Sequence, residues 1–500
     1  MKLSNALLAR CLLIGSTVIL VLVPFHATLT VWLAALGVNY TAVRLWKEVL
    51  LAVLFAGAVT LLVRNAGLRK GLGDNDAIRR ASLLIGAYVL LHVLAGGVAL
   101  LREEVNLLAL GYAFISNLRF LAFFLVTVMV GTYYASWLRQ NWRRLLLWPA
   151  AVVVGFGLLQ MFVLPYDFLQ HFGYEPDTIQ PYIAIDNKVE YTRAQSTLRG
   201  PNPLGAYLVV IVTALAALFV VRRKKYARIA ALLTASILVL YGSYSRSAWI
   251  GAITALGVLA WGLTTSAKLR KYVLVAGAAA LVLFAGSLYV LRDNDTVQNV
   301  VFHTNEQSRS AESSNEQRAG ALVGGIEDVV REPLGRGPGT AGPASVHNDK
   351  PSRISENYFI QIGQEVGVIG LAIFVGICAV VGWALWQQER ANLPALVLCA
   401  SLVGLTVVNL VSHAWADDTL AYIWWGLAGA TIATAGLPTS KAGSTASLLA
   451  PSTFFSSSAP SPYRLYGSLR ASLRKRTGHS SAKVASAARI ERNKYGKKTK

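Results

Sequence analysis

Residues 355–371 read SENYFIQIGQEVGVIGL and join a polar loop to an apolar segment of membrane-helix character. Glu356 stands at the junction, where a carboxylate stays hydrated while it faces the membrane surface. Water and hydrocarbon meet at this depth, so a charged group there can act on molecules embedded in lipid. The stretch therefore predicts a membrane protein whose chemistry takes place at the bilayer surface.

Apolar runs of similar length recur along the whole chain, which has 500 residues, 54% hydrophobic and 14% charged, and a mean hydropathy of +0.49. About 20 residues cross the hydrocarbon core as a helix, and a helix satisfies its own backbone polar groups in lipid. We therefore expect an all-α fold, a polytopic membrane bundle of about twelve transmembrane helices. Their approximate ranges are 6–24, 47–63, 81–101, 112–131, 145–163, 203–221, 229–245, 248–266, 272–291, 358–386, 394–411 and 420–436.

The loops divide into two sets. One set is short and rich in Lys and Arg, around 64–80, 139–144, 222–228 and 268–271, which predicts the cytoplasmic side. The other set contains two large loops, 164–202 and 292–357, which mix acids with bases and are predicted to be extracytoplasmic. We expect a multi-pass protein of the cytoplasmic membrane, with both termini in the cytoplasm and the active site facing outward.

The net charge of +22 does not by itself indicate nucleic-acid binding. Most of the basic residues lie in the short loops and in a Ser-rich tail, 437–500, which follows the membrane domain 1–436. The tail is too polar to bury a core and is predicted to be disordered and to contact membrane lipids. No nucleic-acid partner is expected. The three cysteines, all in apolar segments, indicate neither a disulfide nor a metal site.

Three arginines are candidates for binding an anion at the outward side. Arg119 lies inside the fourth expected span, Arg246 in the short turn YGSYSRSAW, and Arg199 just before GPNPLG at the entry to the sixth span. Guanidinium groups bind phosphate in a bidentate manner, and an arginine within a membrane span is costly unless it meets an anion or water. The alternatives are that Arg119 pairs with a structural carboxylate or snorkels, that Arg246 is an interfacial anchor, and that Arg199, like Arg193, is ordinary loop charge.

The second large loop is predicted to contain an amphipathic helix over 312–331, with Arg318 near its beginning. EPLGRGPG, residues 332–339, then ends the helix in a turn of special conformation. Its amides could cradle a phosphate, although the spacing matches neither a P-loop nor a dinucleotide fingerprint.

The end of this loop offers two candidate general bases. Glu356 precedes Asn357 at the start of the tenth span, and His347 lies nearby in a water-facing segment, where a histidine titrates near neutrality. Glu356 could instead form a helix cap or an ion pair, and a single loop histidine is often incidental. The last outward turn, 412–418, adds a histidine and two acids that either bind a sugar or solvate the turn.

The order of these motifs resembles the O-antigen ligase and O-antigen polymerase superfamily of bacterial envelope glycosyltransferases. The resemblance covers about 46–429 and rests on four short motifs: LRF at 118–120, SRS at 245–247, EPLGRGPG at 332–339, and ENY at 356–358 followed by EVGVIGL at 365–371. It implies transfer or polymerisation of a glycan from a polyprenyl-diphosphate-linked donor to a glycan, lipid or protein acceptor, with no nucleotide or catalytic metal as cofactor. A chain-length regulator is a possible partner.

The resemblance also implies site residues. Outward arginines would hold the diphosphate, which matches Arg119, Arg199, Arg246 and Arg318, and a general base would lie near Glu356, with Asn357 beside the substrate. Many ligases of the family have a His-Asn pair where this chain has Glu356-Asn357, so the ligase histidine is not carried over, and His347-Asn348 lies farther from the helix. Ligase and polymerase therefore stay equally open. A lipid-linked oligosaccharide flippase or another polytopic transporter is the alternative class.

Overall fold

A computed structural model describes residues 4–185, 189–221, 226–264, 314–388 and 392–433, with a few isolated positions between 266 and 290. Within these ranges the regular structure is helical, and an isolated bridge between Ala184 and Thr192 is the one β pairing. The expected all-α class is confirmed. The expected tail, 437–500, lies outside the described residues.

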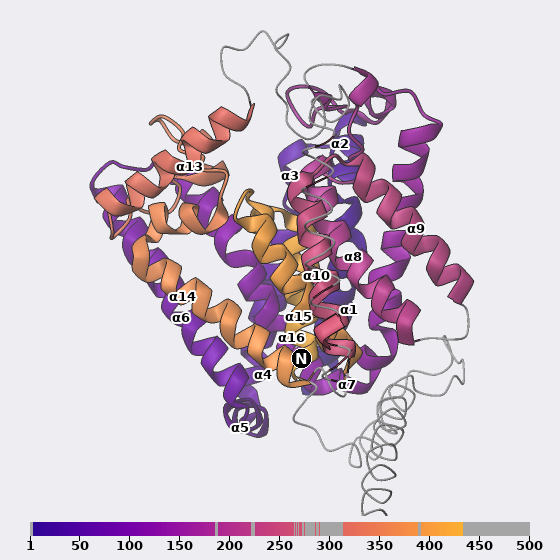
Figure 1. Ribbon diagram of the computed structural model, residues 1–500. Helices are drawn as coiled ribbons and strands as arrows, with labels where there is room; N and C mark the ends of the chain where they lie inside the picture. Colours follow the sequence, from indigo (N-terminus) through magenta and orange to yellow (C-terminus); the bar gives the residue numbers. More distant parts are fainter. Residues whose placement is uncertain are drawn as a thin grey trace, which may run out of the picture.

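Long apolar helices form the bundle (Figure 1). They are α1 (Asn5–Leu22), α4 (Trp46–Arg64), α6 (Asp76–Leu101), α7 (Leu107–Phe162), α8 (Pro201–Val221), α9 (Tyr226–Gly242), α10 (Arg246–Leu263), α14 (Tyr358–Gln388), α15 (Leu393–Asn409) and α16 (Asp418–Ala433).

The expected count of about twelve spans is not confirmed. Among the described residues, seven helical segments have the length and apolar composition to cross a membrane, and the apolar helices α9 and α15 are shorter. The expected spans 112–131 and 145–163 fall within the single kinked helix α7, and most of 272–291 lies outside the described residues. Hydropathy along the sequence gives the length of each apolar run. In the folded chain two runs can belong to one helix, and a helix can be shorter than the apolar run that contains it.

Helix α7 is non-helical at Tyr134, and both of its ends contact the same end of the molecule. Asn106, its N-cap, donates to the carbonyl oxygen of His347, while the Gln160 side chain accepts from the backbone amides of Gln195 and Ser196. Arg199 and His347 line one cavity, so the segments around 195 and 347 lie at the same end of the bundle, which we name the loop end.

The short elements gather mainly at the loop end, at the top of Figure 1, where α2, α3 and α13 are seen. They are η1 (Val23–Phe25), α2 (His26–Ala35), α3 (Tyr40–Arg44), η2 (Phe168–Phe172), η4 (Val189–Tyr191), α13 (Ser314–Arg331), η6 (Gly342–His347) and η7 (Ala414–Ala416). At the opposite end lies α5 (Ala66–Asp74), which carries Arg69 and Lys70 from the first basic loop. The helix expected at 312–331 is present as α13.

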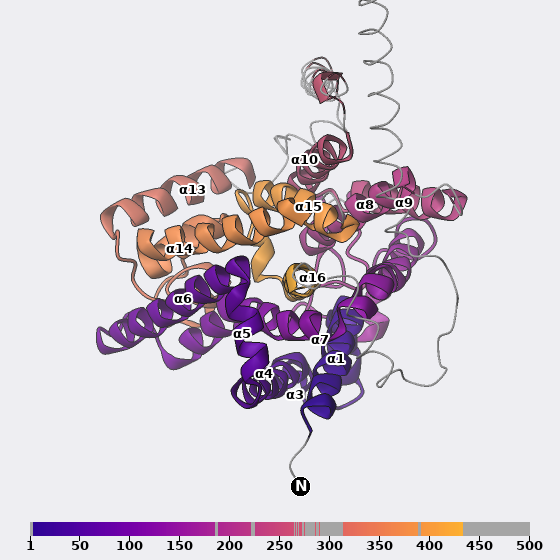
Figure 2. The same cartoon turned by 90° about the horizontal axis from the view of Figure 1, so that it is seen from below.

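Helix α16 lies at the centre of the bundle, between α7 and α15 (Figure 2). Every residue from Thr419 to Ala433 is buried. Its first residue, Asp418, therefore enters the middle of the loop end. A charge in that position has to be matched by charges on the surrounding helices.

Helix α14 is broken at Val366 and Gly367, and the EPLGRGPG turn packs against the break. The amides of Arg336 and Gly337 donate to the carbonyl oxygens of Gln364 and Glu365, at 2.9 and 2.8 Å. The amide of Val368 donates in return to the Pro333 carbonyl oxygen at 2.9 Å. The turn thus satisfies backbone groups that the broken helix leaves unpaired. The amides of Arg336 and Gly337 therefore already have acceptors, and they are not free to bind a phosphate.

Candidate functional site

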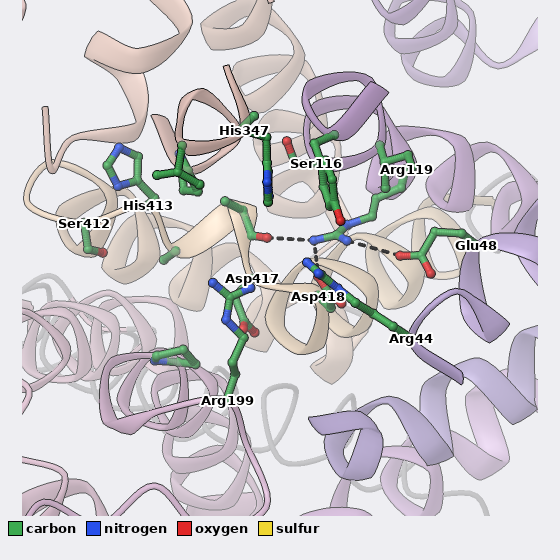
Figure 3. Close-up of a pocket in the computed structure, with 18 of the residues that line it drawn as sticks. Arg44, Glu48, Ser116, Arg119, Arg199, His347, Ser412, His413, Asp417 and Asp418 are labelled. Carbon is green, nitrogen blue, oxygen red and sulfur yellow. Dashed lines mark hydrogen bonds and ion pairs between the residues drawn. The ribbon is translucent and has the colours of Figure 1, made fainter. Parts of the chain in front are cut away.

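A polar cavity of about 370 Å³ opens at the loop end among α3, α4, α7, α8, η6 and the segment before α16. We call it the first cavity. Figure 3 shows side chains from these separate elements converging on it. The Asp, Glu, Lys, Arg and His residues of its lining are Arg44, Lys47, Glu48, Arg119, Arg199, His347, Glu356, His413, Asp417 and Asp418.

Arg119 belongs to a group of charges that balance one another. Its guanidinium ion-pairs with Glu48 at 3.2 Å and with Asp418, and it donates to the Ala416 carbonyl oxygen at 2.7 Å. Lys47 also contacts Glu48 and Asp418, at 3.1 and 2.8 Å. We call Lys47, Glu48, Arg119 and Asp418 the ion-pair network. This is the pairing alternative considered for Arg119 from the sequence, and the network forms one wall of the first cavity.

Arg44 and Arg199 differ from Arg119, because neither guanidinium makes a hydrogen bond or ion pair within the described chain. Arg44 lies over the ring of Tyr112, 5.3 Å from its centroid, and Arg199 is exposed to the cavity. A guanidinium that forms no ion pair within the protein attracts anions from solution. These two arginines therefore provide positive charge that an anion in the cavity would neutralise.

Asp417 lies at the same place without an ion pair in the described chain, and its Oδ1 accepts from the Leu420 amide at 3.2 Å. Burial, followed by the neighbouring negative charge of Asp418, raises the pKa of this carboxyl to about 6. The attraction of Arg199 acts in the opposite direction. The charge of Asp417 therefore changes close to neutral pH.

Arg318 and Glu356 meet at the rim of the first cavity, with Arg318 Nε 3.5 Å from Glu356 Oε2. Glu356 has φ +53°, a left-handed conformation that is unusual for a residue with a side chain. The structure thus holds this carboxylate at the cavity in a strained backbone, an arrangement common at functional sites. The cap of α14 is the next residue rather than Glu356.

Asn357 performs that capping. Its Oδ1 accepts from the amides of Phe359 and Ile360, at 2.9 and 3.0 Å, and its Nδ2 donates to the Leu410 carbonyl oxygen at 2.8 Å. The residue is buried and is absent from the cavity lining. Its side chain fixes the position of Glu356 through the helix start.

His347 lines the first cavity and stacks on Tyr112, with ring centroids 4.0 Å apart. Burial and the nearby positive charge of Arg44 lower the pKa of His347 below its usual value. His413 also lines this cavity, and burial lowers its pKa to about 4. Both histidines are therefore mainly neutral at pH 7.

Arg246 and Arg318 lie near a third arginine that the sequence favoured only as loop charge. Arg193 donates to the Ser243 carbonyl oxygen and to Asn202, which itself lines the first cavity. Burial, followed by repulsion from Arg318 and Arg246, lowers the pKa of Arg193 to about 10. We call Arg193, Arg246 and Arg318 the arginine cluster. Arg246 is not part of the cavity lining, and the cluster lies beside it.

Several residues of the site were missed from the sequence: Arg44, Lys47, Glu48, Tyr112 and the ion pairs of Asp418. The sequence did contain a signal for two of them. Lys47 and Glu48 are consecutive charges at the outward end of the expected span 47–63, and Arg119 lies near the outward end of the expected span 112–131. Charges at that depth need partners within the protein.

The fold and the site define a helical membrane protein with a charged cavity at one end of its bundle. Residues 229–375 match the family model described as O-Antigen ligase, which confirms the resemblance to the O-antigen ligase and polymerase superfamily. The matched segment carries Arg246, Arg318, His347 and Glu356, whereas Arg119 and Arg199 precede it. A search of curated proteins found no match. An O-antigen ligase-like membrane glycosyl-transfer function is thereby supported.

Proposed function

We propose that this protein transfers or polymerises a glycan from a polyprenyl-diphosphate-linked donor at the outer face of the cytoplasmic membrane. The observation that carries the proposal is the first cavity, which Arg44 and Arg199 line without a hydrogen bond or ion pair of their guanidinium groups within the described chain. A diphosphate is an anion of the size and charge that such guanidinium groups bind.

Each cationic group has a separate task in this proposal. Arg44 and Arg199 hold the diphosphate, and the arginine cluster attracts it from the adjacent wall. Arg119 keeps the ion-pair network in place, so its effect on the diphosphate is indirect. Negative charge grows on the diphosphate as the anomeric bond breaks, and prearranged guanidinium groups stabilise that state more than the ground state.

Glu356 is proposed to remove the proton from the acceptor hydroxyl. The acceptor oxygen forms a bond to the anomeric carbon, the carbon–oxygen bond to the diphosphate breaks, and the diphosphate keeps the bonding electron pair. Such a direct displacement inverts the anomeric centre. The pairing of Glu356 with Arg318 orients the carboxylate, and neutral His347 is the second candidate for the base.

The proposed orientation rests on charge. The basic segment of α5 lies at the end of the bundle opposite the first cavity. Basic loops remain in the cytoplasm, so the cavity would open on the outer side. The donor and acceptor would then both be molecules held in or near the outer leaflet.

Reconstitution tests the proposal. Purified protein in liposomes is given a polyprenyl-diphosphate-linked oligosaccharide and candidate acceptors, and release of the carrier diphosphate is followed. We expect release that depends on acceptor, and the product size separates ligase from polymerase. Arg199→Ala should reduce kcat/KM for the lipid-linked substrate about 100-fold or more, because removing a hydrogen-bond donor that stabilises the transition state has an effect of this size.

Arg102→Ala is the matched control for Arg199→Ala, because Arg102 is exposed at the loop end and does not line the cavity. Equal activity of the two variants would refute the role of Arg199. If the intact lipid-linked oligosaccharide moves between leaflets and no carrier diphosphate is released, the protein is a flippase and the proposed transferase function is wrong.

A further inference from the structure

A second cavity, of about 350 Å³, adjoins the first at the loop end. It is bounded by α2, α3, the segment 178–183 and the start of α16, and is partly open to solvent. Four residues line both cavities: Arg44, Arg199, Asp417 and Asp418. These shared residues form a junction at which molecules in the two cavities would meet.

The linings of the two cavities differ in charge. Apart from the junction, the Asp, Glu, Lys and Arg residues that line the first cavity are Lys47, Glu48, Arg119 and Glu356. The second cavity has no Asp, Glu, Lys or Arg outside the junction within the described chain, and its remaining lining is His26, Ala27, Thr30, Tyr40, Thr178, Ile179, Gln180, Ile183 and Thr419. Hydroxyl, amide and aromatic groups of this kind suit a neutral ligand with many hydroxyls rather than a phosphate.

The wall of the second cavity is held in place by buried hydrogen bonds. The Gln195 side chain, which is fully buried, donates to the carbonyl oxygens of Gln180 and Pro181, at 3.0 and 3.1 Å. Gln195 is in turn fixed by Gln160, which accepts from its backbone amide at 3.1 Å. The backbone at Gln180 is therefore fixed although the segment is a loop.

Two polar side chains of this wall, the exposed Gln180 and the half-buried Tyr40, are accessible to a ligand. The Gln180 amide group and the Tyr40 hydroxyl make no hydrogen bond within the described chain, and both residues line the cavity. An amide group both donates and accepts, and a tyrosine hydroxyl does the same, which matches the hydroxyl groups of a sugar.

We propose that the second cavity binds a neutral, hydroxyl-bearing sugar of the acceptor, and that this sugar meets the donor at the junction. The statement that this sugar belongs to the acceptor rests on the proposed function, whereas the statement that the second cavity binds a sugar does not. In this arrangement the diphosphate is held at the junction by Arg44 and Arg199 and lies on the first-cavity side of them. The acceptor hydroxyl passes Arg199 and Asp417 into the first cavity, which Glu356 also lines, while its sugar is held by the uncharged groups of the second cavity.

The experiment measures equilibrium binding without turnover, using the full-length protein in nanodiscs and two probes. One probe is inorganic pyrophosphate, for the first cavity. The other is the neutral oligosaccharide freed from the lipid-linked donor by mild acid, for the second cavity. Gln180→Ala and Tyr40→Phe should each raise the oligosaccharide Kd about five- to tenfold, the value of one hydrogen bond, and leave the pyrophosphate Kd unchanged.

Gln170→Ala is the matched control for Gln180→Ala, since Gln170 is exposed in η2 of the same loop and does not line either cavity. Unchanged oligosaccharide binding by both Gln180→Ala and Tyr40→Phe would overturn the inference. A weaker pyrophosphate affinity in these variants would also overturn it, because the second cavity would then serve the donor. A third outcome is that both variants lose oligosaccharide binding while the wild-type protein shows no glycan transfer. That outcome would refute the transferase function and support the sugar site.

Discussion

Glu356 and Glu365 lie nine positions apart at the start of one helix, and the structure treats them in opposite ways. Glu365 is completely buried, and both carboxylate oxygens are occupied: Oε1 accepts from the Gly339 amide at 2.8 Å and Oε2 from Asn117 Nδ2 at 2.7 Å. Glu356 has a side chain 41% exposed, one long contact to Arg318, and a strained backbone.

The difference separates a structural carboxylate from the proposed catalytic one. The partners of Glu365 come from the EPLGRGPG turn and from α7, so this residue fastens the broken part of α14 to both. A fully satisfied buried group of this kind stabilises and specifies a fold. Glu356 has spare acceptor capacity directed at a cavity, which is the condition for acting on a ligand.

Glu356→Gln should have the largest effect on activity. Glutamine keeps the size and loses the ability to take a proton, so acceptor-dependent release of carrier diphosphate should fall about 10²- to 10⁴-fold. The thermal unfolding midpoint should not change, because the side chain is partly exposed. The measurement is single-turnover transfer in liposomes.

Glu356→Asp provides the comparison for Glu356→Gln, since it keeps the carboxylate and shortens its reach. Partial activity in Glu356→Asp and none in Glu356→Gln would support proton removal. Near-normal transfer by Glu356→Gln would remove Glu356 from this role, and the same assay on His347→Ala would then test the second candidate.

Glu365→Ala, in contrast to Glu356→Gln, should mainly lower the stability of the protein. It leaves the Asn117 amide and the Gly339 N–H buried without an acceptor, at a cost of about 1–3 kcal/mol each. Thermal or denaturant unfolding in detergent should detect this loss. Glu103→Ala is the control, because Glu103 is exposed at the loop end. A Glu365→Ala protein of full stability but without activity would contradict the division between the two glutamates.

The smallest expected effect concerns the charge of Asp417 at the junction. Its pKa is raised to about 6, so the carboxyl is an anion at pH 7.5 and mainly neutral at pH 5. Removing a negative charge beside Arg199 should tighten anion binding at the lower pH, by about fivefold for roughly 1 kcal/mol. Sulfate is the probe, because its own charge is constant over this interval.

Asp417→Asn tests the source of that pH dependence. The variant should bind sulfate at pH 7.5 about as tightly as the wild type does at pH 5, with little further change on acidification. His413, with a pKa of about 4, titrates below this interval, and the lowered pKa of His347 reduces its contribution. An unchanged pH profile in Asp417→Asn would show that another group is responsible.

Part of this site was predictable from local sequence. Glu356 and Arg318 come from segments whose polarity or helical spacing marks them as the surface of a membrane protein, and both lie at the first cavity or its rim. Arg119 shows the limit, because its partners Glu48 and Asp418 come from distant helices. No local pattern distinguishes an arginine that is already paired from one that is free.

The sequence by itself determined the helical membrane class, because in lipid the backbone must satisfy its own hydrogen bonds and long apolar runs have few other solutions. It also located polar segments that the structure places at the first cavity or its rim. Only the tertiary structure decided which charges neutralise one another, that Asn357 is the cap while Glu356 faces a cavity, and that two cavities of different charge share one junction. Those outcomes depend on distances between segments far apart in the chain, and these distances are set by helix packing.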